Sequence, residues 1–97
     1  MKIQFIKSIG SIPYDERYPV AKEEHRGKIA RVQGSQGRTL MMILPCGHHA
    51  TIDTWNITDI DTDHPSATPS IFCRYSNDGT LGNCWHGYLT NGELRSV

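Results

Sequence analysis

Hydrophobic and polar positions alternate along this chain in short runs that are typical of β-strands. Residues 2–7 alternate loosely and residues 28–33 more regularly, so each run predicts a strand. Residues 38–44 are apolar almost throughout, which predicts a strand buried on both faces. Further strands are expected over residues 50–55, 70–75, 85–90 and 93–97. Helical periodicity is nearly absent, and only residues 20–25 carry a weak signal for a helical turn.

Turn signals separate these runs. Gly34 to Gly37 predicts a hairpin turn, because glycine adopts positive φ at little cost. Asn91-Gly92 is the pair that best fits a type I′ hairpin turn. Asn77-Asp78-Gly79 is a further turn signature, residues 10–19 predict an irregular connection, and residues 56–68 predict a long polar loop. The class expected is all-β, a small antiparallel or β-sandwich-like domain of six or seven short strands.

The length and composition favour one thin-cored unit. At 97 residues the chain fits a single domain, residues 1–97. Its hydrophobic fraction of 37% is low for a self-sufficient core. A metal ion or a partner is therefore expected to contribute to stability.

The charge balance argues against nucleic-acid binding. Ten Lys and Arg residues balance ten Asp and Glu residues, whereas a nucleic-acid binder of this size usually carries a basic excess. Basic residues do cluster between Lys22 and Arg31, but acidic residues lie among them, so a mixed-charge solvated face is expected. Nucleic-acid binding would be favoured again if one sheet face carried Arg26, Lys28, Arg31 and Arg38 together.

No segment predicts membrane insertion or export. A bilayer span needs roughly 20 apolar residues, and the charged start of the chain does not resemble a signal peptide. We therefore expect a cytoplasmic protein. Three cysteines in a reducing compartment favour a metal site or buried thiols over disulfides.

Two short Cys/His clusters are the candidate metal ligands. Cys46-Gly47-His48-His49 and Cys84-Trp85-His86 each offer a thiolate and an imidazole, the donors that zinc prefers in a tetrahedral site. The predicted set is Cys46, His48, Cys84 and His86, with His49 and Cys73 as spare candidates. Both pairs are C-x-H rather than the common C-x₂₋₄-C, so the alternative of buried thiols and surface histidines stays open.

Short motifs in the C-terminal half resemble those of a family of uncharacterised small bacterial and phage proteins. They are Pro45-Cys46-Gly47-His48, then Pro69-Ser70-Ile71, then the segment from His86 to Leu94. The family carries P-C-G-C-G, P-S-I and C-x-x-H-Y-x-I-x-N-G in the same order, and residues 27–32 are similar to its opening strand.

The resemblance implies a zinc-ribbon-like site. By position, Cys46 and His86 match family ligands directly, and His48 stands at the family's second Cys. Cys84 lies one residue nearer to His86 than the family's third ligand. If no bulge absorbs this shift, Cys73 takes the place of Cys84.

Three functions follow as hypotheses. The first is a non-enzymatic, zinc-stabilised module that binds a protein partner; the resemblance implies a phage-encoded protein that interferes with a host protein or defence system. The second is a small zinc hydrolase or an accessory enzyme of a ubiquitin-like conjugation pathway, although no H-E-x-x-H or related motif is present. The third is a nucleic-acid-binding module.

Two other features have simpler interpretations. Asp59-Ile60-Asp61-Thr62-Asp63 begins like a calcium loop but lacks the later Gly and Glu, so a solvated acidic loop is expected. Strand alternation places Trp85 and Gly87 on one face and His86 and Tyr88 on the other. We expect Trp85 to lie in the core.

Overall fold

The computed structural model describes residues 1–10, 12, 21–75 and 81–97, except for the side chains of residues 74, 75 and 81–83. It contains eight strands and one short 3₁₀ turn. Their bounds are β1 Gln4–Phe5, η1 Glu23–His25, β2 Lys28–Gly34, β3 Gly37–Ile43, β4 His49–Thr51, β5 Asn56–Thr58, β6 Ser66–Tyr75, β7 Leu81–Thr90 and β8 Glu93–Ser96. The predicted all-β class is confirmed. No helix among the described residues is long and apolar enough to cross a membrane.

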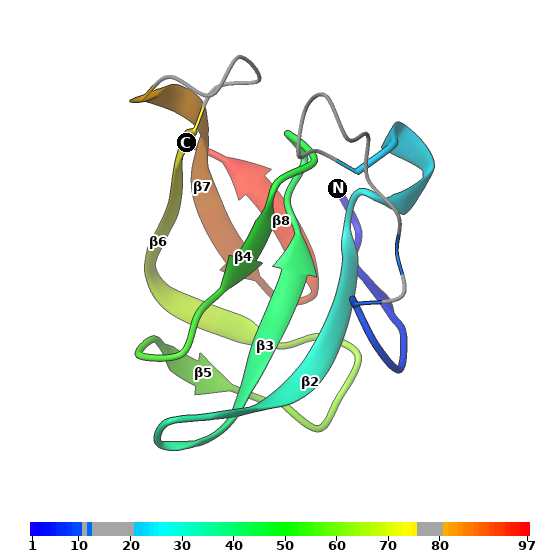
Figure 1. Cartoon of the computed structure of the whole chain (residues 1–97). Coiled ribbons are helices and arrows are strands. Elements are labelled where there is room, and N and C mark those ends of the chain that lie inside the picture. The colour runs from blue at the N-terminus through cyan, green and yellow to red at the C-terminus, as the bar shows by residue number, and fades with distance from the viewer. Residues whose placement is uncertain (11, 13–20, 76–80) are drawn as a thin grey trace.

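The strands form two four-stranded sheets, in the orders β1-β2-β3-β4 and β5-β6-β7-β8 (Figure 1). Each sheet is therefore built from one half of the chain. All pairs are antiparallel except β1 with β2, which run parallel. β1 and β2 can run parallel because a long connection, rather than a hairpin, joins them.

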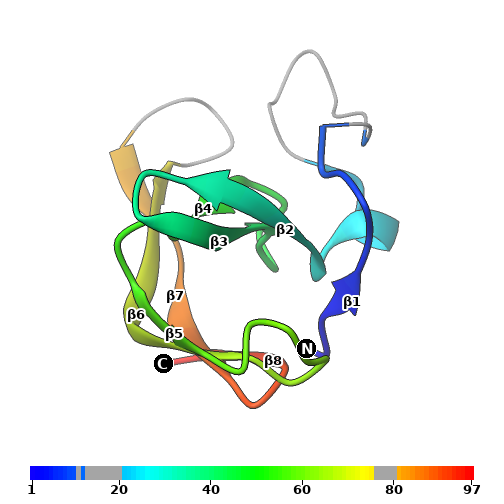
Figure 2. The same ribbon diagram turned by 90° about the horizontal axis from the view of Figure 1, so that it is seen from below.

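The first residues of the chain join the two sheets along one side. The Ile3 N–H donates to Gly92 O at 3.1 Å, and Lys2 forms an isolated bridge with Glu93. The Met1 amino group donates to Leu94 O at 3.0 Å, while the Leu94 N–H donates to Met1 O at 2.8 Å. Seen from below, β1 lies at the edge of the first sheet, and the N-terminus lies beside β8 (Figure 2). The two sheets thus form a barrel-like ring joined through the N-terminal residues.

The main core lies between the two sheets. The first sheet and its flanking turns contribute Ile29, Leu40, Met42, Leu44 and Ile52, and the second contributes Ala67, Ile71, Cys73, Trp85, Leu89 and Leu94. A smaller cluster of Ile9, Ile12, Ala21, Ala30 and Ile43 covers the other face of the first sheet. Consequently β3 is buried on both faces along its C-terminal half, as its apolar sequence predicts.

Both predicted hairpin turns form. The β2–β3 hairpin pairs Gly34 with Gly37, although only Gly37 takes positive φ, at 114°. Gly34 is needed for a different reason: a Cβ there would lie 2.0 Å from Asp53 Oδ1. Asn91 and Gly92 have φ of 49° and 78°, the two positive values that a type I′ turn requires.

Several boundaries differ from the sequence prediction. Residues 56–68 are not one long loop, because β5 occupies Asn56–Thr58 and β6 begins at Ser66. The strand expected over residues 2–7 is reduced to Gln4–Phe5. The weak helical signal over residues 20–25 corresponds to the 3₁₀ turn η1. Most of the connection predicted over residues 10–19 and of the turn at Asn77-Asp78-Gly79 lies outside the described residues.

Candidate metal centre

The β3–β4 turn supplies two of the four candidate ligands. Cys46 and His48 flank Gly47, whose φ of 93° lies in the region that favours glycine. The Gly47 N–H donates to Leu44 O at 2.8 Å, and the Leu44 N–H donates to His48 O at 2.9 Å. These bonds close a tight turn and bring Cys46 Sγ to 3.4 Å from His48 Nδ1.

The second sheet supplies the other two. Cys73 lies in β6 and Cys84 in β7. Their sulfur atoms lie 3.4 Å and 3.2 Å from the same His48 Nδ1. The four ligand atoms all lie within 4.8 Å of one another, and no other such group occurs in the described part of the chain. The group therefore connects the two sheets.

The spacing of the donors fits a small tetrahedral ion. Zinc bonds of about 2.3 Å to sulfur and about 2.05 Å to nitrogen place tetrahedral N and S atoms about 3.6 Å apart. The three N–S separations of 3.2 to 3.4 Å are slightly shorter than this value. A modest outward movement of the side chains gives the metal geometry. The cluster of Cys46, His48, Cys73 and Cys84 could hold a metal ion.

Burial sets the protonation of these groups. Burial raises the pKa of the Cys46 thiol above its ordinary 9.0, and also raises the pKa of the Cys84 thiol. The pKa of His48 is lowered from 6.5, first by burial and then by the charge of Arg26. At neutral pH the metal-free site therefore holds a neutral imidazole, ready to coordinate, and thiols that must lose protons when a metal binds.

Arg26 is a positively charged residue whose charge acts on the groups of this site. Its Nη1 donates to the carbonyl of Pro45, the residue before Cys46, at 3.2 Å. Its charge also lowers the pKa of Cys84, although burial of that thiol has the larger effect. A divalent ion with three thiolates has a formal charge of −1, so an arginine here offsets the excess.

Three of the four predicted ligands lie in this site, and the fourth, His86, does not. Cys46, His48 and Cys84 come together, and Cys73, a spare candidate in the sequence, joins them. His86 does not. It is exposed on the outer face of the second sheet, where its Nε2 lies 2.9 Å from Ser70 Oγ. The other spare candidate, His49, lies in β4 outside the group.

Strand alternation explains the exposure of His86, whereas Cys84, two residues earlier, lies beside the register shift between the Cys73–Trp85 and Tyr75–Leu81 pairs and so departs from the alternation. In the β6–β7 ladder Cys73 pairs with Trp85, and both side chains are buried. Phe72 pairs with His86 one residue away, so both lie on the opposite face. Their rings meet edge to face with centroids 5.0 Å apart. The expected placement of Trp85 in the core is confirmed, and the structure shows that His86 and Tyr88, on the opposite face, are exposed.

A signal for Cys73 was present in the sequence. Cys73 lies five residues before Asp78, and Cys84 lies five residues after Gly79. A hairpin centred on that turn signature brings the two cysteines to nearly opposite positions. The observed pairs Cys73–Trp85 and Tyr75–Leu81, with an irregularity between them, are close to this register.

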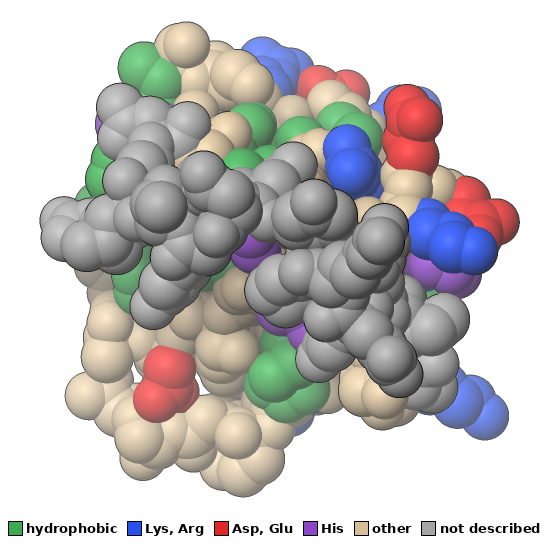
Figure 3. Space-filling model, turned by 45° about the horizontal axis from the view of Figure 1, so that its top comes forward, with side chains coloured by type: hydrophobic (Ala, Val, Ile, Leu, Met, Phe, Trp, Pro, Cys, Tyr) green, Lys and Arg blue, Asp and Glu red, His purple; other side chains and the backbone are tan. Residues whose placement is uncertain are grey.

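The four basic residues whose grouping would favour nucleic acid are each engaged within the protein. Their partners are Pro45 O for Arg26, His25 Nδ1 for Lys28, the carbonyls of Ile60 and Thr62 for Arg31, and Asp61 for Arg38. On the face shown in Figure 3, Lys and Arg side chains lie beside Asp and Glu side chains. The described basic side chains on that face do not form a continuous patch.

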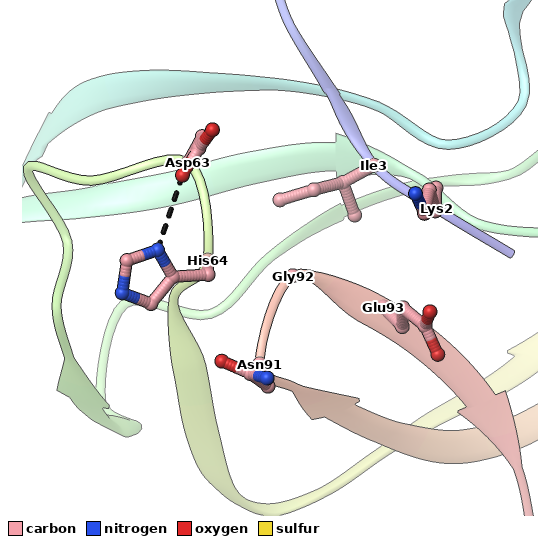
Figure 4. Close-up of a pocket in the computed structure, with 7 residues that line it drawn as sticks. All are labelled: Lys2, Ile3, Asp63, His64, Asn91, Gly92 and Glu93. Atoms are coloured by element: carbon pink, nitrogen blue, oxygen red, sulfur yellow. Dashed lines mark hydrogen bonds and ion pairs between the residues drawn. The ribbon is translucent and has the colours of Figure 1, made fainter.

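Acidic side chains of the loop at residues 59–63 are paired within the protein, and a pocket next to this loop is separate from the metal site. Asp61 pairs with Arg38, and Asp63 Oδ1 lies 3.1 Å from His64 Nδ1. A pocket of 290 Å³ lies between this turn, the N-terminal strand segment and the Asn91-Gly92 turn (Figure 4). It includes none of the metal-site residues. Gly92 allows the close approach of these segments, because a Cβ there would lie 2.9 Å from Asp63 O.

Comparisons with known protein families, with curated proteins and with solved structures find no match. The family resemblance described above therefore depends on its short motifs alone. The structure itself gives a small all-β protein with a cluster of three cysteines and one histidine that could hold a metal ion.

Proposed function

We propose that Cys46, His48, Cys73 and Cys84 bind a structural zinc ion, and that the protein is a zinc-stabilised β module. The observation that carries this proposal is the convergence of three sulfur atoms on one imidazole nitrogen, at 3.2 to 3.4 Å. Thiolate and imidazole donors in a tetrahedral arrangement are the set that zinc prefers. The turn that carries His48 lies 25 and 36 positions before Cys73 and Cys84, so the group forms only through the packing of the two sheets.

The ligand set favours a structural role over catalysis. A catalytic zinc keeps an open coordination position for water or substrate, whereas four protein donors close the tetrahedron. The cluster also contains no carboxylate to act as a general base. A hydrolase or conjugation enzyme is therefore the weaker hypothesis for this site.

The ion would act as a cross-link between the sheets. The β3–β4 turn belongs to the first sheet, whereas Cys73 and Cys84 belong to the second. In a chain with a hydrophobic fraction of only 37%, such a link adds stability that the thin core lacks. It also requires a reducing compartment such as the cytoplasm, where thiolates persist.

For the biological role we favour binding to a protein partner. Phe72 and Tyr88 are 40% and 44% exposed on the outer face of the second sheet, and exposed aromatic residues are common anchors at interfaces. The basic side chains already engaged within the protein make nucleic acid a poorer candidate. The motif resemblance to phage proteins favours a host protein, including a defence component, as the partner.

Metal analysis tests the proposal directly. Protein purified under reducing, chelator-free conditions is expected to contain one zinc per chain by elemental analysis. Replacement by Co²⁺ is expected to give the intense visible bands of tetrahedral cobalt and a sulfur-to-metal charge-transfer band. Protein that is folded but takes up neither ion would reject the zinc site. Capture of a partner by the wild type, but not by a Phe72→Ser, Tyr88→Ser variant that keeps its zinc, tests the binding role separately.

A further inference from the structure

The three thiols of the metal centre differ in their access to solvent. Cys73 is buried in the core with 6% of its surface exposed, where it contacts the cluster that includes Trp85. Cys46 and Cys84 are only partly buried. A small oxidant in solution can therefore reach two of the three sulfurs more readily than the third.

The two accessible sulfurs are also close enough to react with each other. Cys46 Sγ and Cys84 Sγ lie within 4.8 Å, although 38 residues separate them in sequence. A disulfide between them requires the two sulfur atoms to approach to about 2.05 Å, by movement of the β3–β4 turn towards β7.

We propose that Cys46 and Cys84 form a site of reversible oxidative modification, in which peroxide converts the zinc-bound pair into a disulfide and releases the ion. This inference rests on the proposed zinc site. Coordination keeps both sulfurs as thiolates, the form that reacts with peroxide.

The chemistry balances with hydrogen peroxide as the oxidant. One thiolate attacks the peroxide, the O–O bond breaks, and a sulfenic acid and hydroxide form. The second thiolate attacks the sulfenic sulfur, the S–S bond forms, and a second hydroxide leaves. Two electrons pass from the sulfurs to the peroxide. Zn²⁺ is released because it has lost two of its four ligands, and His48 and Cys73 alone bind it weakly.

The disulfide would link the same elements that the ion links. It joins the β3–β4 turn of the first sheet to β7 of the second, so the fold is expected to persist after the zinc leaves. Reduction by a dithiol regenerates both thiols, and added zinc restores the starting state.

Zinc-loaded wild-type protein provides the test. Hydrogen peroxide is added, zinc release is followed with a chromogenic chelator, and disulfides are mapped by mass spectrometry after alkylation of the remaining thiols. The expected result is one zinc released per Cys46–Cys84 disulfide, with Cys73 recovered as the alkylated thiol, and full reversal by dithiothreitol with zinc. Retention of zinc under excess peroxide, a disulfide that includes Cys73, or release without any disulfide would overturn the inference.

The design separates this inference from the zinc proposal. Protein without zinc before oxidant is added contradicts the zinc site itself, whereas loaded protein that resists oxidation contradicts only the switch. Cys84→Ser is the informative variant, because it removes one accessible sulfur and should form no disulfide. If it fails to fold, the mapping on wild-type protein still decides the matter. His86→Ala is the matched control, since His86 lies outside the cluster and should behave as wild type.

Discussion

His48 Nδ1 and Cys84 Sγ lie 3.2 Å apart, although the two residues are 36 positions apart in the chain and belong to different sheets. Such an approach of an imidazole nitrogen and a thiol sulfur is shorter than the separation of about 3.6 Å across a tetrahedral zinc ion. The two sheets therefore meet here through polar donor atoms as well as through apolar side chains.

The first prediction compares Cys73 with His86. Cys73→Ala removes a sulfur that lies 3.4 Å from His48 Nδ1, so zinc affinity should fall by more than about 100-fold, beyond the usual effect of outer-shell changes. The melting temperature should fall with it, because metal binding is coupled to folding. His86→Ala should keep both near wild-type values. Competition with a chromogenic chelator measures the affinity. Loss of zinc in His86→Ala, with retention in Cys73→Ala, would show that His86 rather than Cys73 is the ligand.

The second prediction concerns proton release. In the metal-free site the pKa of the buried Cys46 thiol and that of Cys84 are raised, so both are protonated near pH 7. The pKa of His48 is lowered by burial and by Arg26, so it contributes no proton at that pH. Zinc uptake should therefore release protons from thiols, and apparent affinity should fall as the pH falls. Calorimetry in buffers of different ionisation enthalpy counts these protons, and a count of zero would argue against thiolate ligation.

The same pKa shifts predict how the metal-free protein responds to acid. Burial lowers the pKa of both His48 and His49 below the 6.5 expected in the unfolded chain. Between the folded and unfolded pKa values the unfolded chain binds more protons, so the free energy of unfolding rises as the pH rises through that window. The contribution is complete above pH 6.5 and is lost as the pH falls through the folded values. Urea unfolding of chelator-treated protein at several pH values measures it, and unchanged stability below pH 6.5 would contradict it.

The third prediction concerns Gly87 in β7. A Cβ there would lie 2.2 Å from Arg95 O and 2.5 Å from the Trp85 ring, and backbone on a paired strand cannot move aside easily. Gly87→Ala should therefore destabilise the fold by about 3 kcal/mol, at the upper end of typical overpacking effects. Gly10→Ala, where the nearest atom lies at 3.7 Å and is a side-chain hydroxyl, is the control. Equal melting temperatures for the two variants would show that the β7–β8 spacing is more adaptable.

The fourth prediction compares two arginines. Arg31 donates from Nε to Ile60 O at 2.5 Å and from Nη2 to Thr62 O at 2.9 Å, and its guanidinium lies 4.0 Å from the Phe5 ring centroid. Arg31→Gln should cost about 2 kcal/mol, since hydrogen bonds from charged donors to partly buried carbonyls are among the stronger ones. Arg38→Gln loses only an exposed ion pair with Asp61 and should cost less than about 0.5 kcal/mol. Denaturant unfolding of both variants checks the difference, and a larger effect at Arg38 would contradict it.

Local patterns in the sequence predict the local structure well. The pair Asn91-Gly92 predicts the β7–β8 turn because few other residues tolerate two positive φ values, and the structure has 49° and 78° there. Alternation likewise places Trp85 and His86 on opposite faces, and in the structure Trp85 is buried and His86 exposed. Both features depend on neighbouring residues alone.

Features that depend on distant partners were either missed or, like Cys73 as a metal ligand, predicted only as an alternative. β5 forms in a polar segment because β6 offers it an edge, with Ile57 opposite Ala67, rather than because of its own propensity. Cys73 joins the metal site because the β6–β7 register brings it near Cys84, whereas the motif comparison directs attention to His86. A conflict was nevertheless visible: if Trp85 faces the core, strand alternation places both Cys84 and His86 on the outer face. Cys84 reaches the site beside a register shift in the ladder, which the sequence does not predict.

The bonds between the first residues and β8 have a consequence for how the molecule opens. Met1 and Ile3 hold that side of the ring through main-chain hydrogen bonds that need no ion. On the other side β4 and β5 are not hydrogen-bonded to each other. There we expect the proposed zinc ion to hold the two sheets together. Removal of the ion should therefore let the two sheets separate on the metal side while they stay joined at the N-terminal residues. Amide hydrogen exchange would become faster around β4 and residues 71–73, while the amides of Ile3 and Leu94 stay protected.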